Sequence, residues 1–349
     1  MIKKQPNGKF RARIFSSGIQ IASKVFDHKR DAEAWEQEQK RQLLVGQWID
    51  PRAGTVPLGT VIADFLAEHK GATNPKTWDT TESNLRLHVP ERLKRLPIRT
   101  VSVGNLESAY MTALKEPLAR STVNRVRNDL SIVFAWAARQ EIITENTVTK
   151  SRVPAGGIRA KIAVAPFSEA ELRVTLSAQA AANEQYAKIT EFVSLTGLRW
   201  GELVALRVRD FVAEPMPSIV VSRSASDGYD IKRTKSNRAR RVPLIDRAEE
   251  ILIERLPGKG SNDLIFTSAT GMRLNGGNFK RATRWESTAS GHRFHDLRHT
   301  AATNWLQSGI DIKTVAQWLG HSNPTITLTV YAHYLGEASD LAALTMLRR

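Results

Sequence analysis

Residues 294–303 read FHDLRHTAAT, and this stretch places His295 and His299 four positions apart. Positions four apart share one face of a helix, so the pattern suits either two zinc ligands or two groups that hold an anion. Arg298 lies on the same face as His295, and its fixed positive charge would repel Zn²⁺. A zinc site would also need a third ligand, and Asp296 stands where zinc peptidases carry a glutamate. The stretch therefore favours an anion site, with His299 as a buried structural residue.

The charge balance of the chain indicates a polyanionic partner. Of 349 residues, 51 are Lys or Arg and 35 are Asp or Glu, so the formal net charge is +16 and the pI is near 10.2. Nucleic acid is the expected partner of so basic a surface. The sequence has no cysteine, which excludes disulfides, thiolate metal sites and cysteine nucleophiles, and we expect neither a cofactor nor a metal. It shows no signal peptide and no apolar run long enough to span a membrane, so a cytoplasmic protein without a membrane partner is expected.

The first 55 residues predict a small sheet backed by a helix. Apolar and basic residues alternate in GKFRARIF, and Ser17 and Gly18 form a turn before a second alternating run. Asp27 is placed to cap the helix that follows. In so basic a chain, a DNA-reading face is favoured over a merely solvated one. The candidate contacts on the first strand are Lys9, Arg11 and Arg13.

Residues 56–150 predict a helical domain. Apolar side chains follow the helical period over 58–66 and again over 123–137, where Ser121 is a suitable cap. Basic residues gather at the start of the second of these helices. Contact with DNA phosphates and a solvated charged face are both consistent with them. They are Arg120, Arg125 and Arg127.

Residues 151–166 form a linker that contains proline, glycine and basic residues, and such a segment could cross a DNA groove. Helical order resumes where Ser168 and Glu171 predict a capping box. Between 218 and 245, β-branched runs separated by polar turns predict strands joined by hairpins. The basic linker residues proposed to contact DNA are Arg152 and Arg159.

Four short segments hold unusual polar residues, although each alone is a weak signal. Together they offer two arginines, a lysine, histidines and a tyrosine, which suits a phosphodiester under attack. Charge gathers on the non-bridging oxygens of such a phosphodiester, and Arg199 and Arg298 can bind those oxygens with paired N–H donors. The segments are TGLRWGEL (196–203), KRTKSNRARR (232–241), HDLRHT (295–300) and LGHSNPTITLTVYAH (319–333).

Tyr331 is the candidate nucleophile. Its phenol is protonated at neutral pH, but clustered positive charge favours the phenolate and a neutral histidine can take the proton. His295 is the candidate base. A lysine on a hairpin can protonate the leaving 5′ oxygen, and Lys235 is the candidate acid, with Lys232 as the alternative.

This set of segments, in this order, resembles the signature of the tyrosine recombinases, specifically the phage-type integrases. That signature has an arginine in T-G-x-R-x-x-E, a hairpin lysine, H-x-L-R-H, and L-G-H followed about ten residues later by the nucleophilic tyrosine. The resemblance implies a 3′-phosphotyrosyl intermediate, a free 5′ hydroxyl that attacks a partner duplex, and no need for ATP. It also implies that His321 bonds the scissile phosphate and that Glu202 supports the first arginine. The matching residues are Arg199, Lys235, His295, Arg298, His321 and Tyr331.

The resemblance further implies an architecture that is mainly α with small β-sheets (α+β). Its parts are an arm-site DNA-binding domain (1–55), a helical core-binding domain (56–150), the linker (151–166), a catalytic domain (167–335) and a tail helix (336–349). The tail carries an apolar stripe, and its exchange between protomers is favoured over docking on its own domain.

The implied partners are double-stranded attachment-site DNA, three further protomers in a homotetramer, a host DNA-bending protein and a directionality factor. The implied location is the cytoplasm of a bacterial host, at the nucleoid. Three other functions compete with a phage-type integrase, and a metal-dependent hydrolase is the most remote of them. A DNA-binding regulator with the same fold but no chemistry is disfavoured by the complete residue set. A type IB topoisomerase uses similar residues, but the three-part layout favours an integrase.

Overall fold

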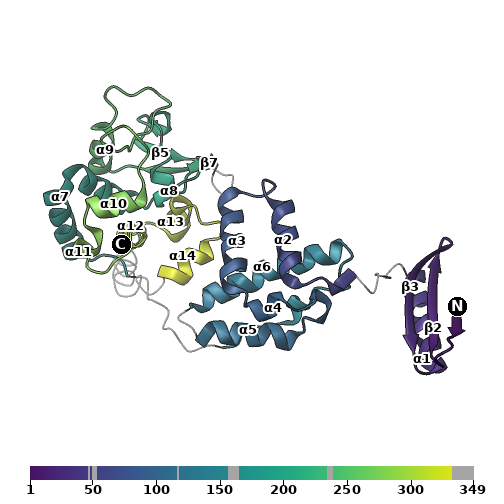
Figure 1. Ribbon diagram of the computed structural model, residues 1–349. Helices are drawn as coiled ribbons and strands as arrows, with labels where there is room; N and C mark the ends of the chain where they lie inside the picture. Colours follow the sequence, from purple (N-terminus) through teal and green to yellow (C-terminus); the bar gives the residue numbers. More distant parts are fainter. Residues whose placement is uncertain (46–47, 49–52, 116–117, 156–164, 234–238, 332–349) are drawn as a thin grey trace, which may run out of the picture. The chain divides into compact units, whose positions relative to one another are not determined.

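The computed structural model describes residues 1–45, 48, 53–115, 118–155, 165–233 and 239–331. The chain divides into two compact units, residues 1–158 and 159–349, and each is described by itself. The division falls inside the predicted linker, and the other predicted domain boundaries stay predictions. Helices dominate the described residues and the sheets are small, which confirms the predicted fold class (Figure 1).

The N-terminal elements form the predicted sheet with a helix on one face. Strands β1 (Ile2–Lys4), β2 (Phe10–Ser16) and β3 (Ile19–Phe26) pair antiparallel in the order β1-β2-β3. Helix α1 (Lys29–Leu44) packs against β2 and β3. Ser17 and Gly18 form the hairpin turn, both with positive φ. Because Ala12 and Ile14 are buried and side chains alternate along a strand, Arg11 and Arg13 face away from α1.

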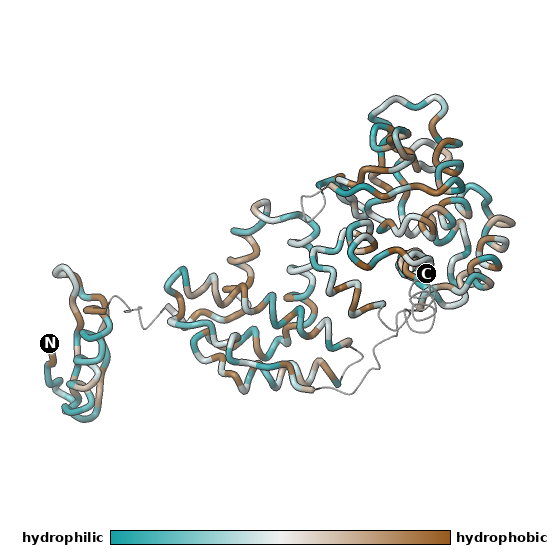
Figure 2. The backbone as a smooth tube through the Cα atoms, turned by 180° about the vertical axis from the view of Figure 1, so that it is seen from behind, coloured by the Kyte–Doolittle hydropathy of each residue, from teal (hydrophilic) through white to brown (hydrophobic). Residues whose placement is uncertain are grey.

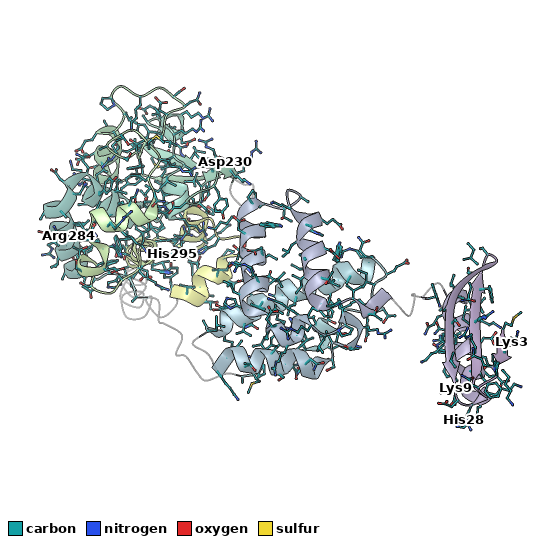
Figure 3. The ribbon with its side chains drawn as sticks, in the orientation of Figure 1. Lys3, Lys9, His28, Asp230, Arg284 and His295 are labelled. Carbon is teal, nitrogen blue, oxygen red and sulfur yellow. The ribbon has the colours of Figure 1, made fainter. Side chains whose placement is uncertain are left out.

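Two predicted helix caps were wrong. Helix α1 has His28 as its N-cap residue without a side-chain cap bond, and the Asp27 carboxylate instead accepts from Lys9 Nζ at 2.8 Å. Figure 3 shows Lys9 and His28 at the same end of the sheet. The second helix begins two residues earlier than expected, with Ala119 as its N-cap, so Ser121 lies inside the helix. Both errors are shifts of one or two residues, the usual uncertainty of helix ends.

The helical part of the first unit packs around its longest helix, α6. The apolar stripe predicted over 123–137 is buried there with residues of the neighbouring helices, and Figure 2 shows apolar and polar residues alternating along these helices. None of the described helices of the protein is both long and apolar enough for a membrane span. The elements are η1 (Ala53–Thr55), α2 (Leu58–His69), α3 (Pro75–His88), α4 (Glu91–Lys94), η2 (Ile98–Thr100), α5 (Val103–Lys115), α6 (Arg120–Arg139) and η3 (Thr147–Lys150).

The second unit begins with the long helix α7 (Glu169–Thr196), which starts at the predicted capping box of Ser168 and Glu171. Two small antiparallel sheets follow, with strand orders β4-β5-β8 and β6-β7. Helices α9 to α14 complete the unit, and α12 packs against both α7 and α13. The helices and turns are α8 (Trp200–Leu203), η4 (Val208–Asp210), α9 (Asp246–Ile253), α10 (Gly276–Ala282), α11 (Trp285–Thr288), α12 (Asp296–Gln307), α13 (Ile312–Leu319) and α14 (Pro324–Tyr331). The strands are β4 (Phe211–Val212), β5 (Ser218–Val221), β6 (Arg223–Ser224), β7 (Lys232–Arg233) and β8 (Arg240–Pro243).

Candidate active site

Arg298 is a buried arginine of the second unit. Its side chain is only 2% exposed, and two of its N–H groups donate to main-chain carbonyls: Nη1 to Gly197 O at 2.8 Å and Nη2 to Leu319 O at 2.5 Å. Burial, reinforced by the charge of Arg199, lowers the pKa of Arg298 to about 9, so the group stays charged at neutral pH. The two carbonyls fix the plane of the guanidinium group. They belong to the ends of α7 and α13, so three helices define its position.

Arg199 is brought to the same place by the turn between α7 and α8. Gly197 ends α7 with φ +62°, and Arg199 then precedes the short helix α8. Its Nη1 donates to Glu202 Oε1 at 2.9 Å and to Leu319 O at 3.4 Å. The two predicted arginines therefore share one carbonyl oxygen. Because 41% of the Arg199 side chain is exposed, this guanidinium also has a solvent side.

A third arginine, Arg240 on β8, joins this group. Its guanidinium forms two bonds with Glu202, Nη1 to Oε1 at 2.8 Å and Nη2 to Oε2 at 2.7 Å, and its Nε donates to Trp318 O at 2.6 Å. Burial alone would raise the pKa of Glu202. The hydrogen bonds and charge of Arg240, with the backbone N–H and charge of Arg199, outweigh burial and lower it to about 2. We call Arg199, Arg240 and Arg298 the arginine cluster.

The end of α13 supports the whole arginine cluster and also leads into His321. The carbonyls of Trp318 and Leu319 accept from all three arginines. Gly320 follows with φ +68°, and a Cβ there would lie 2.9 to 3.0 Å from the Arg240 side chain. His321 Nδ1 lies 2.7 Å from Thr327 Oγ1, and burial with the charges of Arg298 and Arg199 lowers its pKa to about 4.

Tyr331 ends α14 and is 1% exposed. Its ring belongs to a small apolar cluster that includes Leu306 of α12 and Leu319 of α13. Its hydroxyl lies 2.6 Å from His299 Nδ1. The sequence predicted His295 as the base and His299 as a structural residue, but the structure places His299 against the tyrosine, because α14 packs one turn further along α12.

His295, labelled in Figure 3, lies immediately before α12, and its side chain is exposed. The protein packed around it, followed by the charges of Arg298 and Arg199, lowers its pKa. Its ring meets the His299 ring edge to face, with centroids 5.1 Å apart. The structure thus brings five of the six predicted catalytic residues into one region of the second unit: Arg199, His295, Arg298, His321 and Tyr331.

The sixth predicted residue, Lys235, lies outside the described residues, as do Arg159 and the tail helix 336–349. The alternative acid, Lys232, is exposed on β7. The hairpin between β6 and β7 is tied to the site through Asp227, whose carboxylate accepts from Trp200 Nε1 at 3.3 Å and from Gly276 N at 2.8 Å.

The predicted DNA contacts of the first unit occupy different environments. Arg120 and Arg127 donate to main-chain carbonyls of residues 148–153, at 3.0 to 3.5 Å, and so also hold that segment in place. Arg125 pairs with Asp129 at 3.5 Å, and Arg152 is exposed. Their contacts with DNA stay predictions, as do those of Lys9, Arg11 and Arg13.

Comparison with known proteins agrees with this arrangement. Residues 168–337, which contain the arginine cluster and the tyrosine, match the model of the Phage integrase family. The chain belongs to the tyrosine recombinase family. It is a site-specific recombinase.

Relatives of this family match nearly the whole chain. A tyrosine recombinase XerC-like protein of Caldanaerobacter subterraneus subsp. tengcongensis is 24% identical, over 91% of this chain and 89% of its own. The integrase of Mycobacterium phage L5 is 26% identical, over 94% of this chain and 91% of its own. The fold resembles a solved lambda integrase tetramer bound to a Holliday junction, with a TM-score of 0.61 and 20% identity, covering 93% of this chain and 96% of that one.

Two residues of this recombinase site escaped the sequence analysis. Arg240 is one of three arginines in RARR, and strand alternation alone could not say which of them turns inward to Glu202. His299 was visible as the second histidine of HDLRH, but its contact with Tyr331 depends on how α12 and α14 pack. Among the described residues, no group of three or more histidines and carboxylates could hold a metal ion.

Proposed function

We propose that the protein cuts and rejoins DNA strands at specific sites by forming a 3′-phosphotyrosyl bond with Tyr331. One observation carries the proposal. Arg199 and Arg298 both donate to the Leu319 carbonyl, and Tyr331, whose hydroxyl contacts His299 of α12, packs in the same region. A phosphate bound there meets fixed positive charge on one side and a phenol on the other. This combination suits transesterification and needs no metal ion.

In the cleavage step, Arg199 and Arg298 bind the non-bridging oxygens of the scissile phosphate. Their guanidinium groups are oriented before the substrate arrives, so little reorganisation is needed as negative charge develops. His321 adds a hydrogen bond to the same phosphate. The Tyr331 oxygen bonds to phosphorus, and the 5′ oxygen leaves with a proton from the hairpin lysine, Lys235 or the alternative Lys232.

Rejoining follows from the reverse step on another strand. A free 5′ hydroxyl attacks the phosphotyrosyl bond and releases the tyrosine. Because one phosphoester bond replaces another, the bond energy is conserved and no nucleotide hydrolysis is needed. The alternative of a regulator without chemistry leaves the ordered arginines and tyrosine unexplained.

The biological reaction we propose is integration, with excision as its reverse, of a phage genome or another mobile element. The substrate is double-stranded attachment-site DNA in the cytoplasm of a bacterial host. The relative from phage L5 is named an integrase, and the lambda integrase is seen as a tetramer on a Holliday junction. By analogy, four protomers act together and pass their C-terminal tails to neighbours, with a DNA-bending protein and a directionality factor.

The N-terminal parts contribute DNA affinity. The sheet of β1 to β3 presents its face opposite α1, with Arg11 and Arg13, to arm-type sites. The helical domain and the linker grip the core site through their basic residues. Binding through many phosphates weakens steeply with salt, with a log–log slope of about −0.9 per neutralised phosphate.

The first test uses a nicked suicide attachment site, from which the cleaved strand end diffuses away. The wild-type protein should accumulate a DNA–protein adduct that resists SDS, because the 5′ hydroxyl needed for rejoining is lost. Tyr331→Phe should abolish the adduct while leaving DNA binding intact. An adduct that persists in this variant, or wild-type protein that never forms one on its cognate site, contradicts the proposal.

A further inference from the structure

We propose that His299 is a catalytic residue, which accepts the phenolic proton of Tyr331 as the tyrosine attacks the DNA. The contact that carries this inference is the 2.6 Å approach of His299 Nδ1 to the Tyr331 hydroxyl. The inference rests on the proposed function, because it names the proton acceptor for the same nucleophile. It transfers to His299 a role that the residue pattern suggested for His295.

Packing on both sides fixes this contact. Tyr331 is held in an apolar cluster with Ala302 and Leu306 of α12 and Leu319 of α13. His299 lies one turn before Ala302 and two turns before Leu306. The rings of His299 and Tyr331 have centroids 5.6 Å apart. A phenol held this way keeps its oxygen at the imidazole. His295 lies a further turn away and reaches solvent, so it is placed to meet the DNA rather than the buried tyrosine.

The surroundings keep the His299 imidazole neutral. Burial, together with the neighbouring His295 and Arg298, lowers its pKa to about 4, although Asp296 acts in the opposite direction. The other groups near it are Arg293, before α12, and His321, after α13. At neutral pH the ring therefore carries one proton. With that proton on Nε2, the Nδ1 lone pair accepts the hydrogen bond from the tyrosine.

A bound phosphate should raise the pKa of His299, which makes the ring a better proton acceptor. Its negative charge offsets that of Arg298, one cause of the lowered His299 pKa, so the imidazolium becomes less unfavourable when DNA is present. The same phosphate provides the electrophile. Proton transfer to His299 is thus coupled to substrate arrival, and the tyrosine stays protonated in the free protein.

The cleavage step replaces one bond to phosphorus with another and moves two protons. The O–H bond of Tyr331 breaks, its proton adds to His299 Nδ1, and the phenolic oxygen forms a bond to phosphorus. The P–O5′ bond breaks, and the 5′ oxygen takes a proton from the hairpin lysine proposed above. The cleaved state then holds an imidazolium and a neutral lysine, and rejoining returns both protons along the same path.

The test measures the single-turnover cleavage rate of the suicide site between pH 6 and 9 for His299→Gln. Glutamine can accept a hydrogen bond from Tyr331 but cannot take its proton, so the rate at neutral pH should fall by about 10²-fold to 10⁴-fold. Cleavage should then depend on prior ionisation of the tyrosine, so the rate of the variant should rise about tenfold per pH unit. The matched control, His295→Gln, should lack this steep rise.

Two further measurements distinguish loss of the proton acceptor from misfolding of the variant. DNA with a sulfur leaving group in place of the 5′ oxygen needs no acid, so it should not restore His299→Gln, whereas it should restore a variant that lacks the lysine acid. Added imidazole should partly restore His299→Ala. A His299→Gln rate within about threefold of wild type, a pH profile that matches wild type, or faster cleavage would overturn the inference. Because Tyr331→Phe tests the adduct itself, such a result would leave the proposed function standing.

Discussion

The arginines of the second unit and those of the N-terminal hairpin have the same side chain but different anchors. The side chain of Arg298 is buried and that of Arg240 is only 11% exposed, and both bind main-chain carbonyls or Glu202. Arg11 and Arg13 project from β2 on the face opposite α1. Hydrogen bonds of the first kind fix the position of the guanidinium charge, and stabilisation of a transition state needs charges fixed in this way. Arg11 and Arg13 are half-buried, and the attraction to DNA phosphates proposed for them does not require so closely fixed a charge.

The largest expected effect comes from removing a buried anchor. Arg240→Ala leaves Glu202 buried with Arg199 as its remaining arginine partner, so the free energy of unfolding should fall by about 3 kcal/mol. Urea denaturation of the full protein measures this. The matched control is Arg247→Ala, because Arg247 also binds a glutamate, Glu191, but is 43% exposed, and its loss should cost less than about 1 kcal/mol.

Acid unfolding provides a second measure of the same pair. The folded-state pKa of Glu202, about 2, lies below its ordinary value of 4.5, so its ion pairs stabilise the protein fully above about pH 4.5. That contribution is lost as the pH falls toward 2, and Arg240→Ala should flatten this part of the stability curve. Equal losses for the Arg240 and Arg247 variants would mean that burial does not distinguish the two kinds of anchoring.

An intermediate effect is expected from Gly320→Ala. The new Cβ would displace the Arg240 side chain, and the positive φ adds about 1 kcal/mol of backbone strain. Displacement within the arginine cluster should lower the cleavage rate by roughly tenfold to a hundredfold. Gly309→Ala is the control, since Gly309 has φ +82° but no neighbouring atom within 4 Å of its Cβ position. It should lose stability alone, and a similar rate loss in both variants would refute the argument.

The smallest effect is expected in the hairpin. Arg11→Gln should leave folding and cleavage of a core site unchanged, and should reduce the salt slope of arm-site binding by about 0.9, the value for one phosphate contact. Fluorescence anisotropy at several salt concentrations measures the slope. Lys40→Gln, on the helix that covers the other face of the sheet, should leave it unchanged. If both variants change the slope equally, the DNA does not lie on the face of the sheet opposite α1.

The sequence predicted those features that depend on neighbouring residues. The hairpin at Ser17 and Gly18 and the capping box at Ser168 and Glu171 follow from short patterns, and both are present. The motif order also predicted the family. The caps at Asp27 and Ser121 failed because several polar residues compete near each helix start, and the register of the first turn decides among them.

The missed residues depend on contacts between distant segments. Arg240 meets Glu202 across 38 positions, and His299 meets Tyr331 across 32. Helical spacing predicted that the two histidines share one face, and His295 immediately before α12 and His299 within it do lie near each other, with ring centroids 5.1 Å apart. It could not tell which of them α14 would cover, because that choice depends on the apolar packing of Leu306 and Leu319 around the tyrosine.

The carbonyls at the end of α13 have a consequence for synthesis of the protein. Arg199, Arg240 and Arg298 all precede Trp318 and Leu319 in the chain, so a ribosome makes every cation before it makes the oxygens that orient them. A polypeptide that stops short of residue 318 would carry the three arginines without the carbonyl oxygens that orient them. The strand cleavage proposed above would therefore require a chain extended beyond Leu319, because only then can all three arginines be oriented.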